Sequence, residues 1–396
     1  MKRIISLTFI LLLCIFLTRV NAADLYVTNV NELYNAFDTV VDNDQDDVIH
    51  IASGVYDLTS TVKYNPYTEN YTLTIEGAGI GSTILDGGGI VQIMYIDTRP
   101  LSDDSQAHIT IRGITFQNGI VTNESGAGLD FASNDALITV ENSAFLNNIS
   151  SYGGGGIYAR VDAGGAIKLI NNIFYKNQAN GGNGGGAVTY SYNGANITLI
   201  NNTFLENTSS NVGGGAILIF STAIGTGNVY NNIIWNNTAN LGNDLMISNQ
   251  QGNAANLYNN DFSDFDRSVP GSISEGNNIN QDPLLTADFH LQTNSPCINT
   301  GNNSAPGIPS TDFEGQSRIV ESVVDIGADE YHLLGDINDD GKVDISDVIL
   351  VLRIALALDN PKPCSDINAD SKVDISDVIL TLRMALGLDP LEPCIG

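Results

Sequence analysis

An eight-residue pattern of apolar and polar positions recurs seven times between residues 73 and 262. Its first and third positions are mostly apolar and its second position is polar, which is the two-residue period of a β-strand. After a first interval of 36 residues, the copies follow one another every 28 to 30 residues. A period of this length predicts a stack in which each turn of the chain contributes one such strand. The seven octets are Leu73–Ile80, Ile109–Phe116, Ile138–Phe145, Ile167–Phe174, Ile197–Phe204, Gly227–Ile234 and Ala255–Phe262.

Two octet positions repeat a residue type, and each copy should lie on the next at the ~4.8 Å spacing of strands. We expect the fifth position to form an amide ladder that satisfies buried turn groups, and the eighth to form a stacked core column. The fifth position is Gly77, Gly113, Asn142, Asn171, Asn201, Asn231 and Asn259. The eighth position is Ile80, Phe116, Phe145, Phe174, Phe204, Ile234 and Phe262.

A second asparagine series follows three residues after the eighth position, at Asn148, Asn177, Asn207 and Asn237. Glycine clusters at 153–156, 184–186 and 213–215 come next and precede another short apolar strand. Glycine permits the tight bends with positive φ that a coil needs between its sheets. The repeat as a whole resembles a right-handed parallel β-helix, and right-handed crossovers are the strong default for parallel strands.

The flanks of the repeat extend this resemblance. An amphipathic segment, 31–41, and an apolar stretch, 47–58, resemble the capping helix and first strand of pectate-lyase-like β-helices. The segments around 282–301 and 325–331 resemble the C-terminal region of choice-of-anchor Q β-helix proteins. The resemblance implies a mainly β domain over 23–331 with an N-terminal capping helix, because an uncovered end would expose both core and strand edges.

Two acidic twelve-residue loops lie thirty residues apart near the C-terminus. Each has oxygen-bearing side chains at positions 1, 3, 5, 9 and 12, the spacing by which a tight loop wraps Ca²⁺, and the carbonyl of position 7 supplies a further ligand. We therefore expect two Ca²⁺ ions. The ligands of the first loop are Asp336, Asn338, Asp340, Lys342 (carbonyl), Asp344 and Asp347. Those of the second are Asp366, Asn368, Asp370, Lys372 (carbonyl), Asp374 and Asp377.

Each loop leads into an apolar helix, with no helix before it and Asp rather than Glu at position 12. This arrangement over residues 333–395 resembles a type I dockerin, which implies a small all-α module, 332–396, that binds a cohesin domain on a scaffold or cell surface. The resemblance implies identical cohesin contacts in the two halves, so that either half could face the partner. These contacts are Ile345, Ser346 and Arg353, and then Ile375, Ser376 and Arg383.

The two loops differ at position 6, where the sharp turn favours glycine. Gly341 satisfies this preference, whereas Ser371 must adopt a left-handed conformation. For a residue with a side chain this costs on the order of 1 kcal/mol. We expect the second loop to bind Ca²⁺ more weakly.

The N-terminal residues 1–22 have the features of a secretory signal peptide: two basic residues, an apolar run too short to be a comfortable membrane span, and small residues before a cut after Ala22. The mature protein is then expected to be secreted or attached to the cell surface, without a membrane span. In an oxidising compartment Cys364 and Cys394 could either pair or stay free. Cys297 is expected to be buried rather than reactive.

The net charge is −29. Phosphate binding needs basic patches, so nucleic acid is excluded as a partner. The negative charge of the protein would also repel a polyuronate, which is disfavoured as a substrate unless Ca²⁺ or local arginines offset this repulsion.

The stack offers charged side chains but no catalytic signature, so its catalytic residues stay unknown. Arg112 and Glu141 share an octet position and should be neighbours, in an arrangement that is more often structural than catalytic. Outward aromatic residues could stack on sugar rings or simply pack laterally between strands. The charged candidates are Arg112, Asp130, Glu141, Arg160, Asp162, Lys168 and Lys176, and the aromatic ones are Tyr158, Tyr190, Tyr192 and Phe220.

Two functions follow from these observations. Dockerins occur mostly on polysaccharide-degrading enzymes. Together with the lyase-like fold, the dockerin resemblance favours binding or degradation of polysaccharide, by hydrolase or lyase chemistry. The alternative is a non-catalytic adhesin or display protein that uses the stack as a stalk, because the Phe-x-x-Asn and Gly-Gly-Ala repeats also resemble those of polymorphic outer-membrane adhesins. Fold alone does not decide between them.

Overall fold

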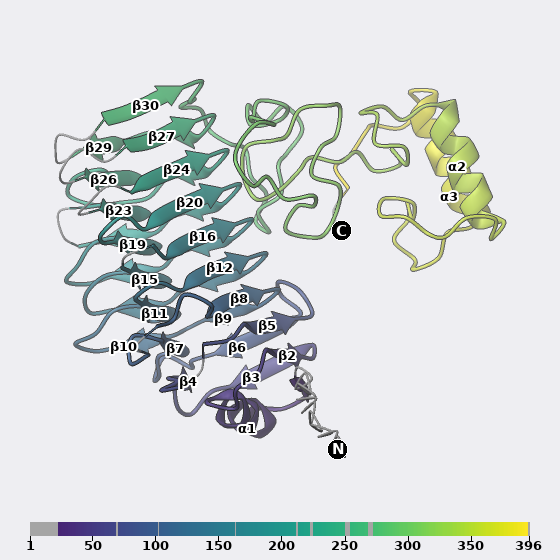
Figure 1. Cartoon of the computed structure of the whole chain (residues 1–396). Coiled ribbons are helices and arrows are strands. Elements are labelled where there is room, and N and C mark those ends of the chain that lie inside the picture. Colours follow the sequence, from purple (N-terminus) through teal and green to yellow (C-terminus); the bar gives the residue numbers. More distant parts are fainter. Residues whose placement is uncertain are drawn as a thin grey trace, which may run out of the picture.

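The computed structural model describes residues 23–394, apart from 69, 102, 163, 211–212, 222–224, 250–253 and 268–271. The predicted signal peptide, 1–22, lies outside the described residues. The chain forms a right-handed parallel β-solenoid, followed by an irregular segment and two C-terminal helices (Figure 1). This confirms the mainly β, parallel β-helix prediction.

Four parallel sheets run along the stack, and from β2 on each turn of the chain visits sheets I, II and III in the same order, with a short strand of sheet IV between II and III in the middle turns. Sheet I contains β1 Ala23–Val27, β2 Asp47–Ile51, β5 Leu73–Gly77, β8 His108–Arg112, β12 Leu137–Glu141, β16 Ala166–Ile170, β20 Asn196–Ile200, β24 Thr226–Tyr230, β27 Ala254–Tyr258 and β30 Ser272–Gly276. Sheet II contains β3 Gly54–Asp57, β6 Thr83–Asp86, β9 Thr115–Gln117, β13 Ala144–Leu146, β17 Ile173–Tyr175, β21 Thr203–Leu205, β25 Ile233–Trp235 and β28 Asp261–Phe262. Sheet III contains β4 Val62–Tyr64, β7 Met94–Asp97, β11 Leu129–Ser133, β15 Ile157–Val161, β19 Ala187–Ser191, β23 Ile217–Ser221, β26 Leu245–Asn249 and β29 Phe265–Arg267. Sheet IV contains β10 Ile120–Val121, β14 Ile149–Ser150, β18 Gln178–Ala179 and β22 Thr208–Ser209.

The register of sheet I follows the octets. The first octet residue of each turn pairs with that of the next, as Ile109 with Ile138 and Ile138 with Ile167. Within each strand, the first and third octet positions therefore point into the coil and the second and fourth point outward, since side chains alternate along a strand. Glycines Gly156 and Gly186 lie where a Cβ would come within 2.6 and 2.7 Å of a carbonyl oxygen on the next turn, so the coil admits no side chain there.

The predicted core column is present. The rings of Phe116, Phe145, Phe174 and Phe204 are stacked, with centroids 4.3 to 5.1 Å apart, and all four are fully buried. One member was predicted wrongly. Leu85, rather than Ile80, pairs with Phe116, because a turn through Gly79 and Gly81 lengthens the first copy of the repeat. A pattern of octets alone does not detect an insertion inside a copy.

The main amide ladder lies one residue beyond the predicted position. It runs through the sixth octet residue, where each side-chain amide donates to the side-chain oxygen of the next turn, as in Asn172 to Asn202 (3.1 Å) and Asn202 to Asn232 (2.9 Å). The second predicted ladder is confirmed, with Asn148, Asn177, Asn207 and Asn237 joined at 3.0 Å. The asparagine side chains of both ladders also accept hydrogen bonds from backbone N–H groups and donate to backbone carbonyls at the corners of the coil, where strand pairing is interrupted.

The fifth-position asparagines form part of the predicted ladder, in which Asn171 donates to Asn142 (3.0 Å) and Asn231 donates to Asn201 (3.4 Å), and they have a further role that was not predicted. Asn171, Asn201, Asn231 and Asn259 all have φ near +50°, a left-handed conformation that asparagine tolerates. Their side-chain amides donate to backbone carbonyls of the segment between 300 and 327. They therefore turn each corner of the coil and fasten the C-terminal segment to its side.

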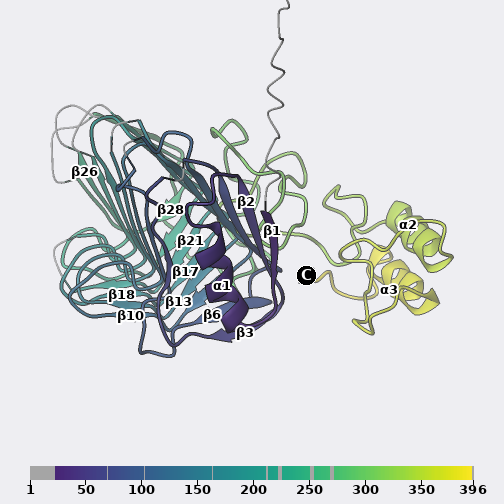
Figure 2. The same cartoon turned by 60° about the horizontal axis from the view of Figure 1, so that its bottom comes forward.

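Helix α1 (Val30–Val40) lies across the N-terminal end of the coil (Figure 2). Asn29 caps it, and its Leu33, Phe37 and Val40 side chains belong to the same core cluster as the strands. The apolar stretch 47–58 is divided into β2 and β3, so the prediction of one strand there was wrong. The division occurs before Gly54, where the chain turns from sheet I into sheet II.

Residues 280–331 pack against the side of the stack with little regular structure (Figure 1). Arg318 is fully buried in this segment and donates to the backbone carbonyls of Ala328 and Asp329. It also donates to the side chain of Asn171, on the stack. A buried guanidinium needs such a set of acceptors, so Arg318 ties the segment to the coil.

Two equal helices complete the chain, α2 (Ile345–Ala355) and α3 (Ile375–Ala385). Asp344 and Asp374 form capping boxes with Asp347 and Asp377. The helices pack on one another through a small core that includes Val348, Val351 and Val378.

The sixth-position ladder yields a first prediction. Asn202→Ala removes the side-chain oxygen that accepts from the backbone and side-chain N–H groups of Asn172, and the side-chain N–H that donates to Asn232 Oδ1 and the Leu169 carbonyl. We expect a loss of about 3 kcal/mol in unfolding free energy, because these buried groups lose hydrogen bonds that water cannot replace. The control is Asn228→Ala on the outer face of sheet I, where one hydrogen bond to Asn256 is lost and less than about 1 kcal/mol is expected. Urea unfolding of the two variants makes the comparison, and equal losses would contradict a special role of the ladder.

Candidate functional site

The two acidic loops fold in the same way. In the first loop, the Asp336 carboxylate accepts from the backbone N–H of Asp340 (3.2 Å) and Gly341 (2.7 Å). The Asp347 carboxylate accepts from Ile337 (2.9 Å) and Asp344 (3.0 Å). The side-chain oxygens of Asn338, Asp340 and Asp344 each accept from the backbone two residues on. Asp366, Asn368, Asp370, Asp374 and Asp377 repeat these bonds in the second loop, at 2.7 to 3.3 Å.

The donor set fits a hard cation. Asp336 is 3% exposed and Asp347 is fully buried, although both carry carboxylates. Burial raises the pKa of Asp336, and the Asp347 and Asp340 carboxylates raise it further, while hydrogen bonds from Gly341 and Asp340 oppose the shift. A divalent ion held by oxygens would offset this repulsion. The side-chain ligands predicted from spacing are thus gathered on one loop in each half.

The second loop is the more open of the two. Asp366 is half-buried, whereas its counterpart Asp336 is buried. Ser371 has φ +69° and Gly341 has φ +79°, so the predicted left-handed position 6 is confirmed in both loops. The weaker binding of Ca²⁺ by the second loop stays a prediction, with more exposure as an added reason for it.

Each helix leaves an apolar stripe uncovered. On α2 it consists of Ile345, Ile349, Leu352 and Leu356, and on α3 of Ile375, Ile379, Leu382 and Leu386, all exposed. Residues at these spacings lie on one face of a helix. Among the predicted partner contacts, Ser346 is exposed and Ser376 is half-buried. Arg353 and Arg383 are exposed and form two-point ion pairs with Asp359 and Asp389, at 2.6 to 2.9 Å.

The cysteine alternatives are decided. Cys364 and Cys394 form a disulfide with their Cα atoms 5.5 Å apart. Next to it, Leu333 bridges Pro393, so the two ends of the 332–394 segment are held together. Cys297 is free and buried, as expected, and its thiol lies 3.4 Å from an Asp261 carboxylate oxygen. Burial and this carboxylate raise the pKa of the Cys297 thiol, which keeps it unreactive.

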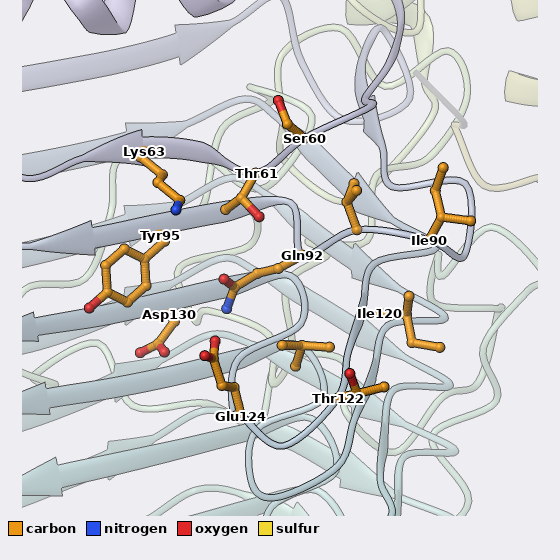
Figure 3. A pocket seen from close by; sticks show the side chains of 12 residues that line it. Ser60, Thr61, Lys63, Ile90, Gln92, Tyr95, Ile120, Thr122, Glu124 and Asp130 are labelled. Carbon is orange, nitrogen blue, oxygen red and sulfur yellow. The ribbon is translucent and has the colours of Figure 1, made fainter.

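A groove of about 810 Å³ lies on the stack between 60 and 130. Successive strands of sheet III place Lys63, Tyr95 and Asp130 at one register position, side by side on its outer face (Figure 3). The Glu124 carboxylate lies beside that of Asp130, and Gln92 lines the same wall (Figure 3). Carboxylates, an amide, a phenol and an ammonium thus converge on an open cleft, as at polar ligand sites.

Asp130 has an unusual environment. Burial raises the pKa of its carboxyl to about 7, with Glu124 as the next contribution. Asp97, two residues along from Tyr95, behaves in the opposite way: burial raises its pKa, but hydrogen bonds and charge from Arg99 outweigh this and leave it low. A carboxyl that titrates near neutrality in a cleft can take up or give a proton there.

The other charged candidates do not gather into a site. Arg112 binds Glu76 and lies 4.0 Å from Glu141, so the predicted neighbour relation is confirmed as part of a ladder on sheet I. Tyr158 and Tyr190 pack against Val188, Leu218 and Met246, which supports the lateral-packing alternative for these aromatics. The Tyr192 ring lies 4.8 Å from the Arg160 guanidinium. The side chain of Phe220 lies outside the described part of the chain.

Sequence reasoning named Asp130 but missed Lys63, Tyr95 and Glu124. The first two lie on β4 and β7, which precede the regular glycine-marked copies of sheet III. Aligning the apolar alternation of Val62–Tyr64 and Met94–Asp97 with that of 129–133 is the signal that would have placed them together.

No protein family, no curated protein and no solved structure matches this chain. Among the described residues, α1, α2 and α3 are each 11 residues long, and none has the length of an apolar membrane span.

Asp130 yields a second prediction. In the folded protein the pKa of Asp130 is about 7, whereas that of an unfolded aspartate is near 3.9. The contribution of this carboxyl to the free energy of unfolding is therefore full below about pH 4 and falls as the pH rises to about 7. Asp130→Asn removes that loss. We expect the variant to be stabilised relative to the natural protein at pH 8, by on the order of 1 kcal/mol, and to gain nothing at pH 4.

Thermal midpoints at the two pH values measure this effect. Asp57→Asn, on an exposed position of sheet II, removes the same charge and should change stability by less than about 0.5 kcal/mol at either pH. Equal behaviour of the two variants would show that the Asp130 carboxyl is not desolvated.

Proposed function

We propose that residues 332–396 form a calcium-binding dockerin that docks the protein to a cohesin-type domain on a scaffold or cell surface. The observation that carries this proposal is the equality of the two halves: two loops with the same hydrogen bonds, each followed by an 11-residue helix with the same exposed apolar stripe. Exposed stripes of this kind are typical of protein interfaces. Ile345, Ser346 and Arg353, or their copies Ile375, Ser376 and Arg383, would contact the partner from either half.

Calcium would act on the loops and not on the helices directly. Asp336, Asn338, Asp340, Asp344 and Asp347, with the Lys342 carbonyl, would hold one ion. The second set, with the Lys372 carbonyl, would hold the other. Each ion would neutralise its loop and fix the start of the helix that follows.

Neighbouring aspartates in the first loop give the sharpest test. Asp340 is at ligand position 5 and Asp339 is at position 4, so Asp340→Asn and Asp339→Asn remove the same charge from the same loop. We expect Asp340→Asn to weaken one of two Ca²⁺ sites by roughly tenfold or more, and Asp339→Asn by less than about threefold.

Calorimetry of the full chain measures the two sites, and capture by a type I cohesin, with and without a chelator, tests docking. Absence of Ca²⁺ binding, or an equal effect of the two variants, would overturn the calcium proposal. Calcium binding without cohesin capture would support the calcium proposal and refute the docking role.

For the stack, we infer a role in binding or degrading a polysaccharide outside the cell, with export directed by the signal peptide 1–22. The groove around Asp130 supports this inference, since its side chains suit the hydroxyl groups of sugars and one carboxyl titrates near neutrality. A glycoside hydrolase would use such a carboxyl as an acid together with a second carboxyl group, here that of Glu124. The second candidate is an adhesin or display protein. It is favoured by the lateral packing of Tyr158 and Tyr190, which are held in the wall of the stack.

Release of sugar ends separates the two roles. Incubation of the full chain with a panel of polysaccharides should release newly reducing or unsaturated ends, and Asp130→Asn should slow this release roughly a hundredfold or more. Asp57→Asn is the control and should not slow it. Retained binding to glycan or cells without turnover of any polymer would favour the display role.

A further inference from the structure

A second, unrelated group of metal-binding side chains lies in the irregular segment beside the stack. His290, Glu314 and Asp329 each offer a ligand atom, and these atoms lie within 4.8 Å of one another. Asp288 adds a carboxylate on the same side of the imidazole. None of these residues belongs to the acidic loops or to the groove.

The backbone brings these residues together from two turns and from the end of the irregular segment. The chain reverses between the bridged residues Leu285 and Leu291, which places Asp288 and His290 at one tip. A second reversal, bridged at Thr311 and Ser317, carries Glu314. Asp329 comes from the end of the segment, which has no regular secondary structure there.

Asp329 lies against the other ring nitrogen of His290 and orients the imidazole. Its Oδ1 lies 3.1 Å from Nδ1 of His290, and its Oδ2 accepts from the backbone N–H of Leu291 at 2.7 Å. Because a carboxylate only accepts, Nδ1 carries the proton and Nε2 is directed to the other side of the ring. A carboxylate behind the distal nitrogen is the usual support of a metal-binding histidine.

Two further carboxylates face Nε2. Its distance is 3.6 Å to Oε1 of Glu314 and 3.8 Å to Oδ2 of Asp288. An imidazolium N–H paired with one of them would approach to about 2.8 Å. Two ligands on one tetrahedral ion, each 2.0 to 2.2 Å from it, are instead roughly 3.4 Å apart. The two distances from Nε2 are closer to this second value, while the exposed Asp288 carboxylate lies outside the group of ligand atoms that are all within 4.8 Å of one another.

The surroundings are partly enclosed. His290 is 5% exposed, and its ring lies 5.4 Å from the ring of Phe313. The Asp288 side chain, in contrast, is 60% exposed. An ion there would have a protein wall on one side and room for water on the other.

We propose that Nε2 of His290 and the carboxylate of Glu314 bind a divalent first-row transition metal ion such as Zn²⁺, and that the exposed Asp288 carboxylate completes the site. One imidazole nitrogen with two carboxylates suits such an ion, whereas Ca²⁺ takes oxygen ligands only. The ion would join the 285–291 turn to the 311–317 turn and so stiffen the segment that covers the side of the stack. This proposal does not depend on the dockerin or the polysaccharide role.

The test uses the full chain, stripped with a chelator and then saturated with Ca²⁺ so that the acidic loops cannot take the probe ion. Co²⁺ absorption reports a nitrogen-containing site, and Zn²⁺ calorimetry gives its affinity. We expect one site, abolished by His290→Gln and weakened roughly 10- to 100-fold by Asp329→Asn, which touches only the distal nitrogen.

His50 is the matched control, because it too lies between two carboxylates, Glu76 at 2.5 Å and Asp24 at 3.6 Å. His50→Gln should leave binding unchanged. Since His290→Gln can impair folding, Asp288→Asn on the exposed side is the second variant, with a loss of roughly tenfold or more. Absence of a Co²⁺ band, or equal binding by the natural protein, His290→Gln and Asp288→Asn, would overturn the proposal and leave the group as a structural ion-pair cluster.

Discussion

Side-chain amides that repeat from turn to turn hold this molecule together. Each buried ladder asparagine accepts from the turn before it and donates to the turn after it, while it also satisfies backbone groups at a corner where no strand partner exists. Buried polar groups are costly unless all are paired, so a ladder is stable only when its members are aligned. The same alignment stacks the phenylalanine column and brings the glycine corners of successive turns into close contact.

The non-periodic parts of the stack domain lie on the outer faces of its sheets. The left-handed asparagines at the fifth octet position turn their amides outward to carbonyls of residues 300–327, which lets an irregular segment cover one side of the coil. Arg318 supplies the converse contact, from the segment to Asn171. The His290 group lies within that segment, and the Asp130 groove lies on another sheet near the N-terminal end of the stack.

The C-terminal module is built on a different principle, in which carboxylates organise a loop and the loop begins a helix. Asp347 and Asp377 accept backbone N–H groups of their loops and also complete the capping boxes of α2 and α3. The loop and the helix are therefore one unit, and whatever neutralises the loop also supports the stripe of apolar residues on the helix. The disulfide between Cys364 and Cys394 joins equivalent points of the two units.

Much of this could be predicted from sequence, because it is local or periodic. The octet spacing determined the strands of sheet I and their register, and the 1, 3, 5, 9, 12 spacing determined which side chains gather in each acidic loop. The shift of the ladder from Asn201 to Asn202 was not predictable in this way, since both positions repeat with the same period and only the backbone conformation distinguishes them. Tertiary structure alone decided the contacts between non-periodic residues: Leu85 in place of Ile80, Glu124 beside Asp130, and the group of Asp288, His290, Glu314 and Asp329, which come from two turns and the end of the irregular segment. Such contacts arise from how loops of unequal length cross a regular surface, and no spacing along the chain encodes them.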